Sequence, residues 1–258
     1  MEAASSGPEP KISHDVVDGV ATVVIGHTAK RNALTPAMWR ALPPLLDRLA
    51  VDPAVRVLVL RGEGATFSAG ADVAALREPD QSLPALSVRA EEALAAFPKP
   101  TLAAVRGHCV GGGCQLAVAC DLRFAEEGAQ FGVTPANLGV VYLSAPTRRL
   151  AALVGPSAAK FLLFSGELID AARALRTGLV DEVLPRGELD GRVADFTRTL
   201  ATRSQLTQVA AKEFVAGRRD RDAYWERQAI EQAGPGGDTA EGVAAFLERR
   251  APRFTWPA

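Results

Sequence analysis

The sequence lacks a charge excess, a long apolar run and a cysteine framework, and each absence excludes a class of protein. Its 258 residues carry 29 Lys and Arg against 30 Asp and Glu, a formal net charge of -1. This balance argues against a nucleic-acid partner, which usually requires a broad basic field. No window approaches the ~20 apolar residues of a membrane span, and residues 1–10 lack the apolar run of a signal peptide. We therefore expect a cytoplasmic protein with a small-molecule partner, no membrane association and a disordered lead-in over residues 1–10.

The few cysteines also exclude two kinds of site. Cys109, Cys114 and Cys120 lie within twelve positions of one another. An odd count in one cluster argues against a disulfide framework and against a structural zinc site. We interpret them as small buried side chains in a reducing compartment and expect no metal site. A catalytic thiol is the alternative, but the sequence arranges no evident histidine and acid around any of the three.

Short apolar strands alternate with helices through the first half of the chain. Asp18-Gly19 between two β-like runs predicts a hairpin over 12–25. Further strands are predicted at 56–61, 101–105, 122–125 and 130–132, and helices at 36–50 and 83–97, the first bent or interrupted at Pro43-Pro44. Strands that are apolar on both faces predict an α/β fold with a parallel sheet covered by helices.

The second half is mostly helical in pattern. Helices are predicted at 145–154, 157–165, 171–176, 189–201 and 206–216, with one strand at 179–183. Because there is no fixed-period repeat and no long linker, this half is expected to continue the same unit or to cap its edge.

Two glycine-rich turns carry the strongest chemical signal. Gly111-Gly112-Gly113 joins a β-like run to an apolar helix-like run. Glycines leave the backbone N–H groups at a helix N-terminus uncovered, so a negatively charged group can approach them closely. Upstream, a second turn runs from Phe67 to Val73. One N–H from each turn could together hold an oxyanion.

Five pieces of the sequence, in order, resemble the crotonase (enoyl-CoA hydratase/isomerase) superfamily. They are Lys30-Arg31-Asn32-Ala33-Leu34, Phe67-Ser68-Ala69-Gly70-Ala71-Asp72, Gly111-Gly112-Gly113, Gly178-Leu179-Val180-Asp181-Glu182-Val183 and Glu241-Gly242-Val243-Ala244-Ala245-Phe246-Leu247-Glu248-Arg249-Arg250.

The resemblance implies a spiral of β-turn-β-α units over residues 11–190. It also implies a helical C-terminal region over 191–258 that forms a homotrimer or a dimer of trimers. The ligand it implies is an acyl-CoA thioester, with no cofactor beyond the coenzyme A moiety. The N–H groups of Ala71 and Gly112 would hold the thioester carbonyl, which agrees with the interpretation of the two turns. Substrate contacts are implied at Lys30, Arg31, Ala33, Ala69, Asp72, Val73, Gly111 and Gln115.

The sequence departs from the hydratases of that superfamily at both catalytic glutamates. The corresponding positions hold Gln115 and Pro135. A glutamine amide does not titrate and proline has no suitable side chain, so neither can act as general acid or base. Losing both groups should leave little hydratase activity.

The segment from Phe131 to Tyr142 is similar instead to the methylmalonyl-CoA decarboxylase branch. The shared residues are Thr134, Pro135, Asn137 and a Leu-Gly-Val-x-Tyr ending. The resemblance places Thr134 and Tyr142 in the active site. That branch has histidine in place of Ala71 and glutamate in place of Gln115.

We therefore predict a lyase that decarboxylates a malonyl-type CoA, in a site without a carboxylate base. Two alternatives stay open: a non-catalytic acyl-CoA-binding protein, and residual enoyl-CoA hydratase or isomerase activity that uses a base from elsewhere. Thr134 has a structural alternative as the N-cap of a turn at Pro135, Tyr142 as a half-buried aromatic, and Asp72 as a turn-stabilising carboxylate. His108 is interpreted as structural, and residues 78–88 as the wall of the acyl pocket.

Overall fold

The computed structural model describes residues 9–74 and 83–257. The expected lead-in therefore lies outside the described residues, apart from Glu9 and Pro10. The predicted hairpin is confirmed: β1 (Lys11–Val17) pairs antiparallel with β2 (Val20–Gly26). Asp18 and Gly19 both have left-handed backbone angles, with φ of 50° and 83°, as a tight two-residue turn requires.

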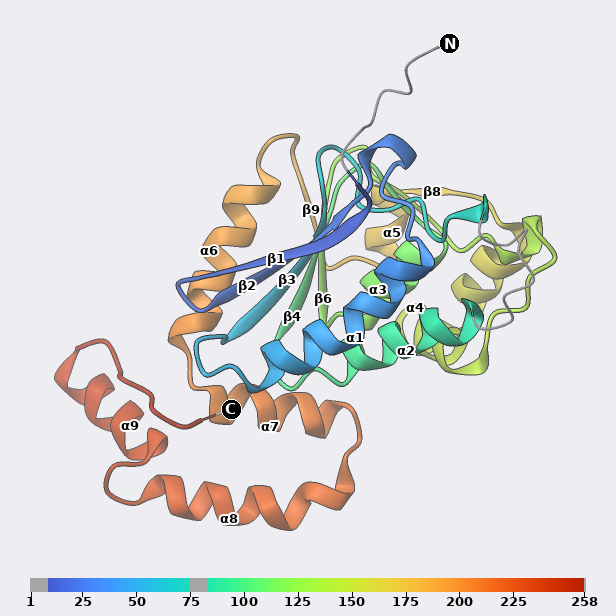
Figure 1. Cartoon of the computed structure of the whole chain (residues 1–258). Helices are drawn as coiled ribbons and strands as arrows, with labels where there is room; N and C mark the ends of the chain where they lie inside the picture. The colour runs from blue at the N-terminus through green and yellow to red at the C-terminus, as the bar shows by residue number, and fades with distance from the viewer. Residues whose placement is uncertain (1–8, 75–82, 258) are drawn as a thin grey trace.

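A six-stranded sheet forms the centre of the molecule (Figure 1). It continues through β3 (Val57–Gly62), β4 (Thr101–Val105), β6 (Leu122–Glu126) and β9 (Glu182–Leu184), in the order β1-β2-β3-β4-β6-β9. Every pair after the hairpin is parallel. The predicted parallel sheet is thus confirmed, although the strand expected at 179–183 begins only at Glu182.

A second, three-stranded sheet has the order β5-β7-β8, with β5 (His108–Val110), β7 (Gln130–Gly132) and β8 (Ile169–Asp170). Consecutive strands divide between the two sheets: β4 lies in the large sheet and β5 in the small one, and the same holds for β6 and β7. A helix then follows each pair, α3 (Gly112–Ala119) after β5 and α4 (Ser144–Ser165) after β7. The chain therefore repeats the β-turn-β-α unit. Strands β5 and β8 were not predicted as strands, since they are short and each is defined by its pairing with β7.

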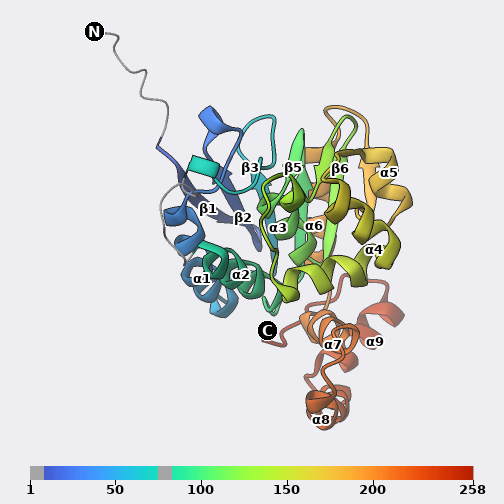
Figure 2. The same cartoon turned by 90° about the vertical axis from the view of Figure 1, so that its right-hand side faces the viewer.

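Helices cover both faces of the large sheet (Figure 2). On one face, α1 (Pro36–Val51), α2 (Leu83–Ala95), α3 and α4 enclose the larger hydrophobic core. On the other face, α6 (Leu189–Thr202) packs over a smaller core. Leu58 and Leu60 of β3 enter the first core and Val59 enters the second. This alternation explains why the strands are apolar on both faces.

Helix α1 corrects one expectation, because it runs through Pro43-Pro44 without interruption. Each proline removes one backbone N–H donor from the helix. Pro44 is exposed and Pro43 is half-buried, so both prolines lie on the side of the helix away from the core. The opposite side is held by six buried side chains, Met38, Trp39, Leu42, Leu45, Leu46 and Leu49. Burial of each large apolar side chain contributes about 1.5–3 kcal/mol, which outweighs the local loss.

The remaining helices are short or lie towards the C-terminus. Short helices are η1 (Thr28–Lys30), η3 (Pro135–Asn137), α5 (Ala171–Arg176) and η4 (Arg219–Arg221). The two helices predicted at 145–154 and 157–165 form α4, which kinks at Gly155. Helices α7 (Gln205–Val215), α8 (Asp222–Ala233) and α9 (Asp238–Glu248) extend beyond one end of the sheet (Figure 1). None of the helices in the described ranges is both long and apolar enough to cross a membrane.

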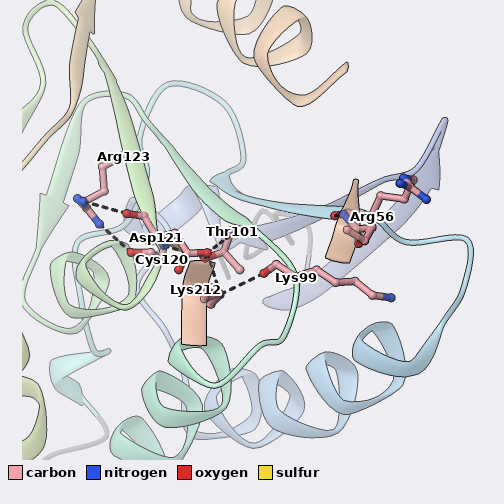
Figure 3. A network of polar contacts seen from close by, with 8 residues as sticks. Arg56, Lys99, Thr101, Cys120, Asp121, Arg123 and Lys212 are labelled. Carbon is pink, nitrogen blue, oxygen red and sulfur yellow. Dashed lines mark hydrogen bonds and ion pairs between the residues drawn. The ribbon is translucent and has the colours of Figure 1, made fainter. Parts of the chain in front are cut away.

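A polar network joins α7 to the sheet (Figure 3). The Asp121 carboxylate accepts hydrogen bonds from the backbone and hydroxyl of Thr101 and from the Lys212 ammonium, the last at 2.8 Å. Lys212 also donates to the Lys99 carbonyl. Arg123 is 3% exposed. Its guanidinium donates to the carbonyls of Leu179, Cys120 and Asp121 and to the Asp181 carboxylate.

Arg123→Met should destabilise the protein by about 2–4 kcal/mol, because it leaves the buried carbonyls of Leu179 and Cys120 without their donor. The Asp181 carboxylate keeps its hydrogen bond from the Arg123 backbone N–H. Arg198→Met is the matched control, since Arg198 pairs with Asp195 on the surface and its side chain is 71% exposed. The control should change the free energy of unfolding by less than about 0.5 kcal/mol. Urea unfolding followed by circular dichroism measures both, and equal small effects would contradict the assigned role of Arg123.

Candidate active site

Ser68 holds the two glycine-rich turns together. Its N–H donates to the His108 carbonyl at 2.8 Å, and its carbonyl accepts from the Val110 N–H at 2.9 Å. Its hydroxyl donates to the Asn32 carbonyl and accepts from the Gly70 N–H. The segment around Ser68 therefore runs alongside β5, and its position is fixed on both sides.

Gly70 allows these two segments to approach closely. Its φ of 96° lies in the region that favours glycine. A Cβ at this position would lie 2.8 Å from the Val110 carbonyl oxygen and 3.3 Å from the Gly112 nitrogen. No other residue fits this contact, so Gly70 places the next peptide, that of Ala71, against the start of α3.

The Ala71 N–H is turned away from its neighbouring strand. The flanking residues make the ladder bonds there: Gly70 accepts from the Leu34 N–H at 2.7 Å and Asp72 donates to the Leu34 carbonyl at 2.9 Å. The Ala71 nitrogen lies 3.8 Å from the position that a Cβ on Gly112 would occupy. Within the described ranges, neither the Ala71 N–H nor the Gly112 N–H has a hydrogen-bond acceptor. Two unpaired donors therefore lie side by side, one of them at the N-terminus of α3.

Gly112 must also be glycine, because Trp39 packs against it. A Cβ there would lie only 2.9 Å from Cζ2 of the buried Trp39 ring. The indole thus packs directly against the peptide that carries one of the two donors. A side chain at position 112 would displace either the ring or the N–H.

Ala71 and Gly112, which carry these two N–H donors, line a cavity of about 160 Å³ whose wall is mostly apolar. Eight of the residues predicted for the site line it: Ala69, Ala71, Asp72, Val73, Gly111, Gly112, Thr134 and Tyr142. Pro135 lines it as well, as do Pro84, Ser87 and Val88 of the predicted pocket wall at 78–88; residues 78–82 lie outside the described residues. The other four predicted residues do not line the cavity: Lys30, Arg31, Ala33 and Gln115.

The four predicted residues outside the wall occupy different environments. Lys30 forms an ion pair with Asp72 at 2.8 Å, and this hydrogen bond is the main reason that the pKa of Asp72 is lowered. Arg31 is exposed and Ala33 is buried. Gln115 is 1% exposed, and both its amide oxygen and its amide nitrogen lack a hydrogen-bond partner.

Thr134 and Tyr142 bring two hydroxyl-bearing side chains to the cavity wall. The Tyr142 hydroxyl lies beside the first glycine of the triplet, 3.5 Å from the position of a Cβ on Gly111. Burial, with smaller contributions from Cys114 and Glu91, raises the pKa of Tyr142 above its usual value. The phenol therefore stays protonated at neutral pH and can donate a hydrogen bond. Thr134 occupies the N-cap position of η3, as its structural alternative predicted, but its side chain makes no capping hydrogen bond.

The histidine and cysteines set aside in the sequence analysis remain outside the cavity wall. His108 lies on β5 and does not line the cavity. All three cysteines are buried and unoxidised. Burial raises the pKa of the Cys120 thiol to about 12 and that of Cys109 above its usual value. Thiols held in this form are poor nucleophiles.

Glu91 is a residue of this cavity that the sequence analysis missed. It lies on α2, lines the cavity, and is 2% exposed. Its Oε2 atom has no hydrogen-bond partner. Burial raises the pKa of Glu91 to about 8, the nearby Arg149 opposes this, and Glu92 adds to it. The cavity wall therefore includes a buried carboxyl group from α2, besides the Asp72 side chain named in the sequence analysis.

A sequence signal for this residue was present. Pro84, Ser87, Val88 and Glu91 occur at positions i, i+3, i+4 and i+7, which share one face of a helix, and all four line the cavity. The Ala-rich composition of α2 concealed this spacing. A glutamate on a helix is also usually interpreted as a solvated residue.

Glu91→Gln should change how stability depends on pH. Burial raises the pKa of Glu91 from 4.5 to about 8 on folding, so its ionisation costs no stability below pH 4.5, and the cost grows as the pH rises to about 8. Between pH 5 and 8 the wild type should lose up to about 1.4 kcal/mol per pH unit relative to the variant. Urea unfolding at several pH values measures this difference. Parallel pH profiles for the two proteins would show that the carboxyl group titrates normally.

Comparison with known proteins assigns the family. The enoyl-CoA hydratase/isomerase family model matches residues 15–256. The chain is 34% identical to the 2,3-dehydroadipyl-CoA hydratase of Escherichia coli, over 91% of this chain and 94% of that protein. It is 35% identical to the crotonyl-CoA hydratase of Syntrophomonas wolfei, with the same two coverages. A crystal structure of an enoyl-CoA hydratase/isomerase family member superposes with a TM-score of 0.90 at 38% identity, covering 98% of this chain and 100% of that one. The chain has the crotonase fold and belongs to the enoyl-CoA hydratase/isomerase family of enzymes.

Proposed function

We propose that the cavity binds the acyl part of a CoA thioester and that its reaction passes through the thioester enolate. The observation that carries this proposal is that the N–H groups of Ala71 and Gly112, both at the cavity wall, have no hydrogen-bond acceptor within the described ranges. Two fixed donors stabilise negative charge on a carbonyl oxygen without having to reorient. Each such donor typically contributes about 3 kcal/mol to the transition state.

Simple hydration fits this cavity poorly, although the named relatives include hydratases. Adding water to an enoyl-CoA requires one group that activates the water and another that protonates the carbon. The positions of the two hydratase glutamates hold Gln115, whose amide is buried, and Pro135. Neither residue can transfer a proton.

Decarboxylation of a malonyl-type CoA is the reaction that the cavity supports best. The carbon–carbon bond to the carboxylate breaks, its electron pair enters the enolate, and carbon dioxide leaves. In the described part of the chain, no cationic side chain lines the cavity, and most of the wall is apolar. Such a wall destabilises a localised carboxylate more than a delocalised enolate. Tyr142 and Thr134 supply hydroxyl groups that can orient the carboxylate.

Double-bond isomerisation is a second candidate, favoured by Glu91. An isomerase needs one acid/base group that moves a proton between two carbons of the same acyl chain. A single buried carboxyl group in an apolar cavity suits that task, and its pKa of about 8 lies close to the working pH.

A panel of thioesters distinguishes these functions. Incubation with malonyl-CoA, methylmalonyl-CoA, crotonyl-CoA and 3-hexenoyl-CoA, followed by mass spectrometry and chromatography, detects carbon dioxide loss, hydration or isomerisation. We expect loss of carbon dioxide from a malonyl-type thioester. Isomerisation alone would transfer the assignment to the second candidate, and binding of every thioester without turnover would identify a non-catalytic binding protein.

Gly112→Pro should lower kcat/KM by about 100- to 1000-fold relative to Gly112→Ala. Both variants place a Cβ against Trp39, but only proline removes the N–H. Steady-state kinetics on the substrate found with the panel measures the ratio. Gly191→Ala controls for a glycine-to-alanine change in the first turn of a helix, because a Cβ there meets no atom within 4 Å. Equal kinetics for the proline and alanine variants would contradict the proposed oxyanion hole.

A further inference from the structure

Helix α2 brings one carboxyl group to the wall of the cavity, next to Pro84, Ser87 and Val88. Glu91 lies on the same helix face as Pro84 and Val88, and all three line the cavity. The neighbouring Glu92 points elsewhere, since its carboxylate pairs with Arg149 of α4 and its side chain is 50% exposed. The two adjacent glutamates therefore have different environments and provide a matched comparison.

The Glu91 carboxyl group is not used to hold the fold together. Its Oε2 atom is buried without a hydrogen-bond partner. An unpaired buried polar group costs about 1–3 kcal/mol, so this carboxyl group lowers stability where it stands. Arg149 is close enough to act on it electrostatically, yet the Nη1 atom of Arg149 is itself buried without a partner. An unpaired carboxyl group in a cavity is characteristic of a functional position.

The Glu91 carboxyl group and the N–H donors of Ala71 and Gly112 belong to the same cavity. Its charge contributes to the raised pKa of Tyr142, and the Tyr142 hydroxyl lies beside Gly111, the residue before one of the donors. Glu91, Tyr142 and Gly112 all line this one cavity. A thioester carbonyl held by the two N–H groups would place its neighbouring carbon inside it.

We propose that Glu91 is the acid/base residue that exchanges a proton with the carbon next to the thioester carbonyl. This role rests on the proposed function, because it requires a thioester in the cavity. After carbon dioxide leaves, the enolate carbon takes the carboxyl proton of Glu91, the carbonyl re-forms, and the resulting carboxylate regains a proton from water. With an acyl-CoA that has no carboxylate to lose, the ionised Glu91 removes a proton from the same carbon and returns it. In both cases protons and electron pairs balance without a further reactant.

Burial keeps Glu91 largely protonated at neutral pH, since its pKa is about 8. A proton donor is what an enolate requires once carbon dioxide has left. A neutral carboxyl group also does not repel the carboxylate of an incoming malonyl-type substrate.

Hydrogen–deuterium exchange on butyryl-CoA tests this role without requiring decarboxylation. The protein is incubated with butyryl-CoA in D2O, and mass spectrometry follows deuterium at the carbon next to the carbonyl. We expect the wild type to catalyse exchange, Glu91→Gln to lower the rate by about 100-fold or more, and Glu92→Gln to stay within about threefold of the wild type. Affinity for butyryl-CoA, measured by calorimetry, should change little in Glu91→Gln.

The outcomes separate this role from the proposed function. Exchange that is lost in Gly112→Pro but retained in Glu91→Gln would overturn the role of Glu91 and leave the enolate chemistry intact. A wild type that neither binds butyryl-CoA nor catalyses exchange would overturn both, and one that binds it without exchange would overturn the role of Glu91. Glu91→Leu repeats the test with an apolar side chain if the glutamine variant does not fold.

Discussion

The close approach of two backbone segments determines the rest of this structure. The Ala71 and Gly112 peptides belong to different β-turn-β-α units, and they meet because Ser68 pairs with β5 and because Gly70 has no side chain. Trp39 then packs against Gly112. Each contact is of van der Waals or hydrogen-bond length, so a Cβ at Gly70 would push the two segments apart, and a Cβ at Gly112 would press against the Trp39 ring. Because the surrounding interior is close-packed, it holds the two peptides in this position.

Two buried polar side chains close to this meeting point lack hydrogen-bond partners. The position that holds a glutamate in the hydratases resembled here holds Gln115, whose amide is buried with neither atom paired. The carboxyl group comes instead from α2, through Glu91. Both groups are left without partners in a close-packed interior, which lowers stability. Proteins tolerate such groups chiefly where function requires them. We interpret the site as one in which the acid/base group has moved while the two N–H donors have kept their place.

Much of the fold could be predicted from the sequence because its signals are local. Asp18-Gly19 specified the hairpin, apolar runs specified β3, β4 and β6, and the glycine triplet specified the start of α3. The short strands β5 and β8 could not be found in this way, since they depend on pairing with β7 and, for β5, also with Ser68. Pro43 and Pro44 misled the analysis of α1, where tertiary packing of the opposite face outweighs the local preference.

The residues of the site also divide into those with a local sequence signal and those without one. Ala71, Gly112, Thr134 and Tyr142 lie in turns with recognisable motifs, and the structure brings all four to one cavity. Glu91 lies in a helix of ordinary composition, and whether such a glutamate faces solvent or a cavity depends on what packs against the helix. The positions of Lys30 and Gln115 depend in the same way on distant partners, an ion pair with Asp72 in one case and a close-packed core in the other.

The most direct test of this account is a crystal structure of the protein with butyryl-CoA bound. The account predicts that the thioester oxygen lies about 2.7–3.1 Å from both the Ala71 nitrogen and the Gly112 nitrogen, with the neighbouring carbon facing the Glu91 carboxyl group. A thioester whose oxygen contacts neither nitrogen, or whose acyl chain lies outside the cavity, would contradict it.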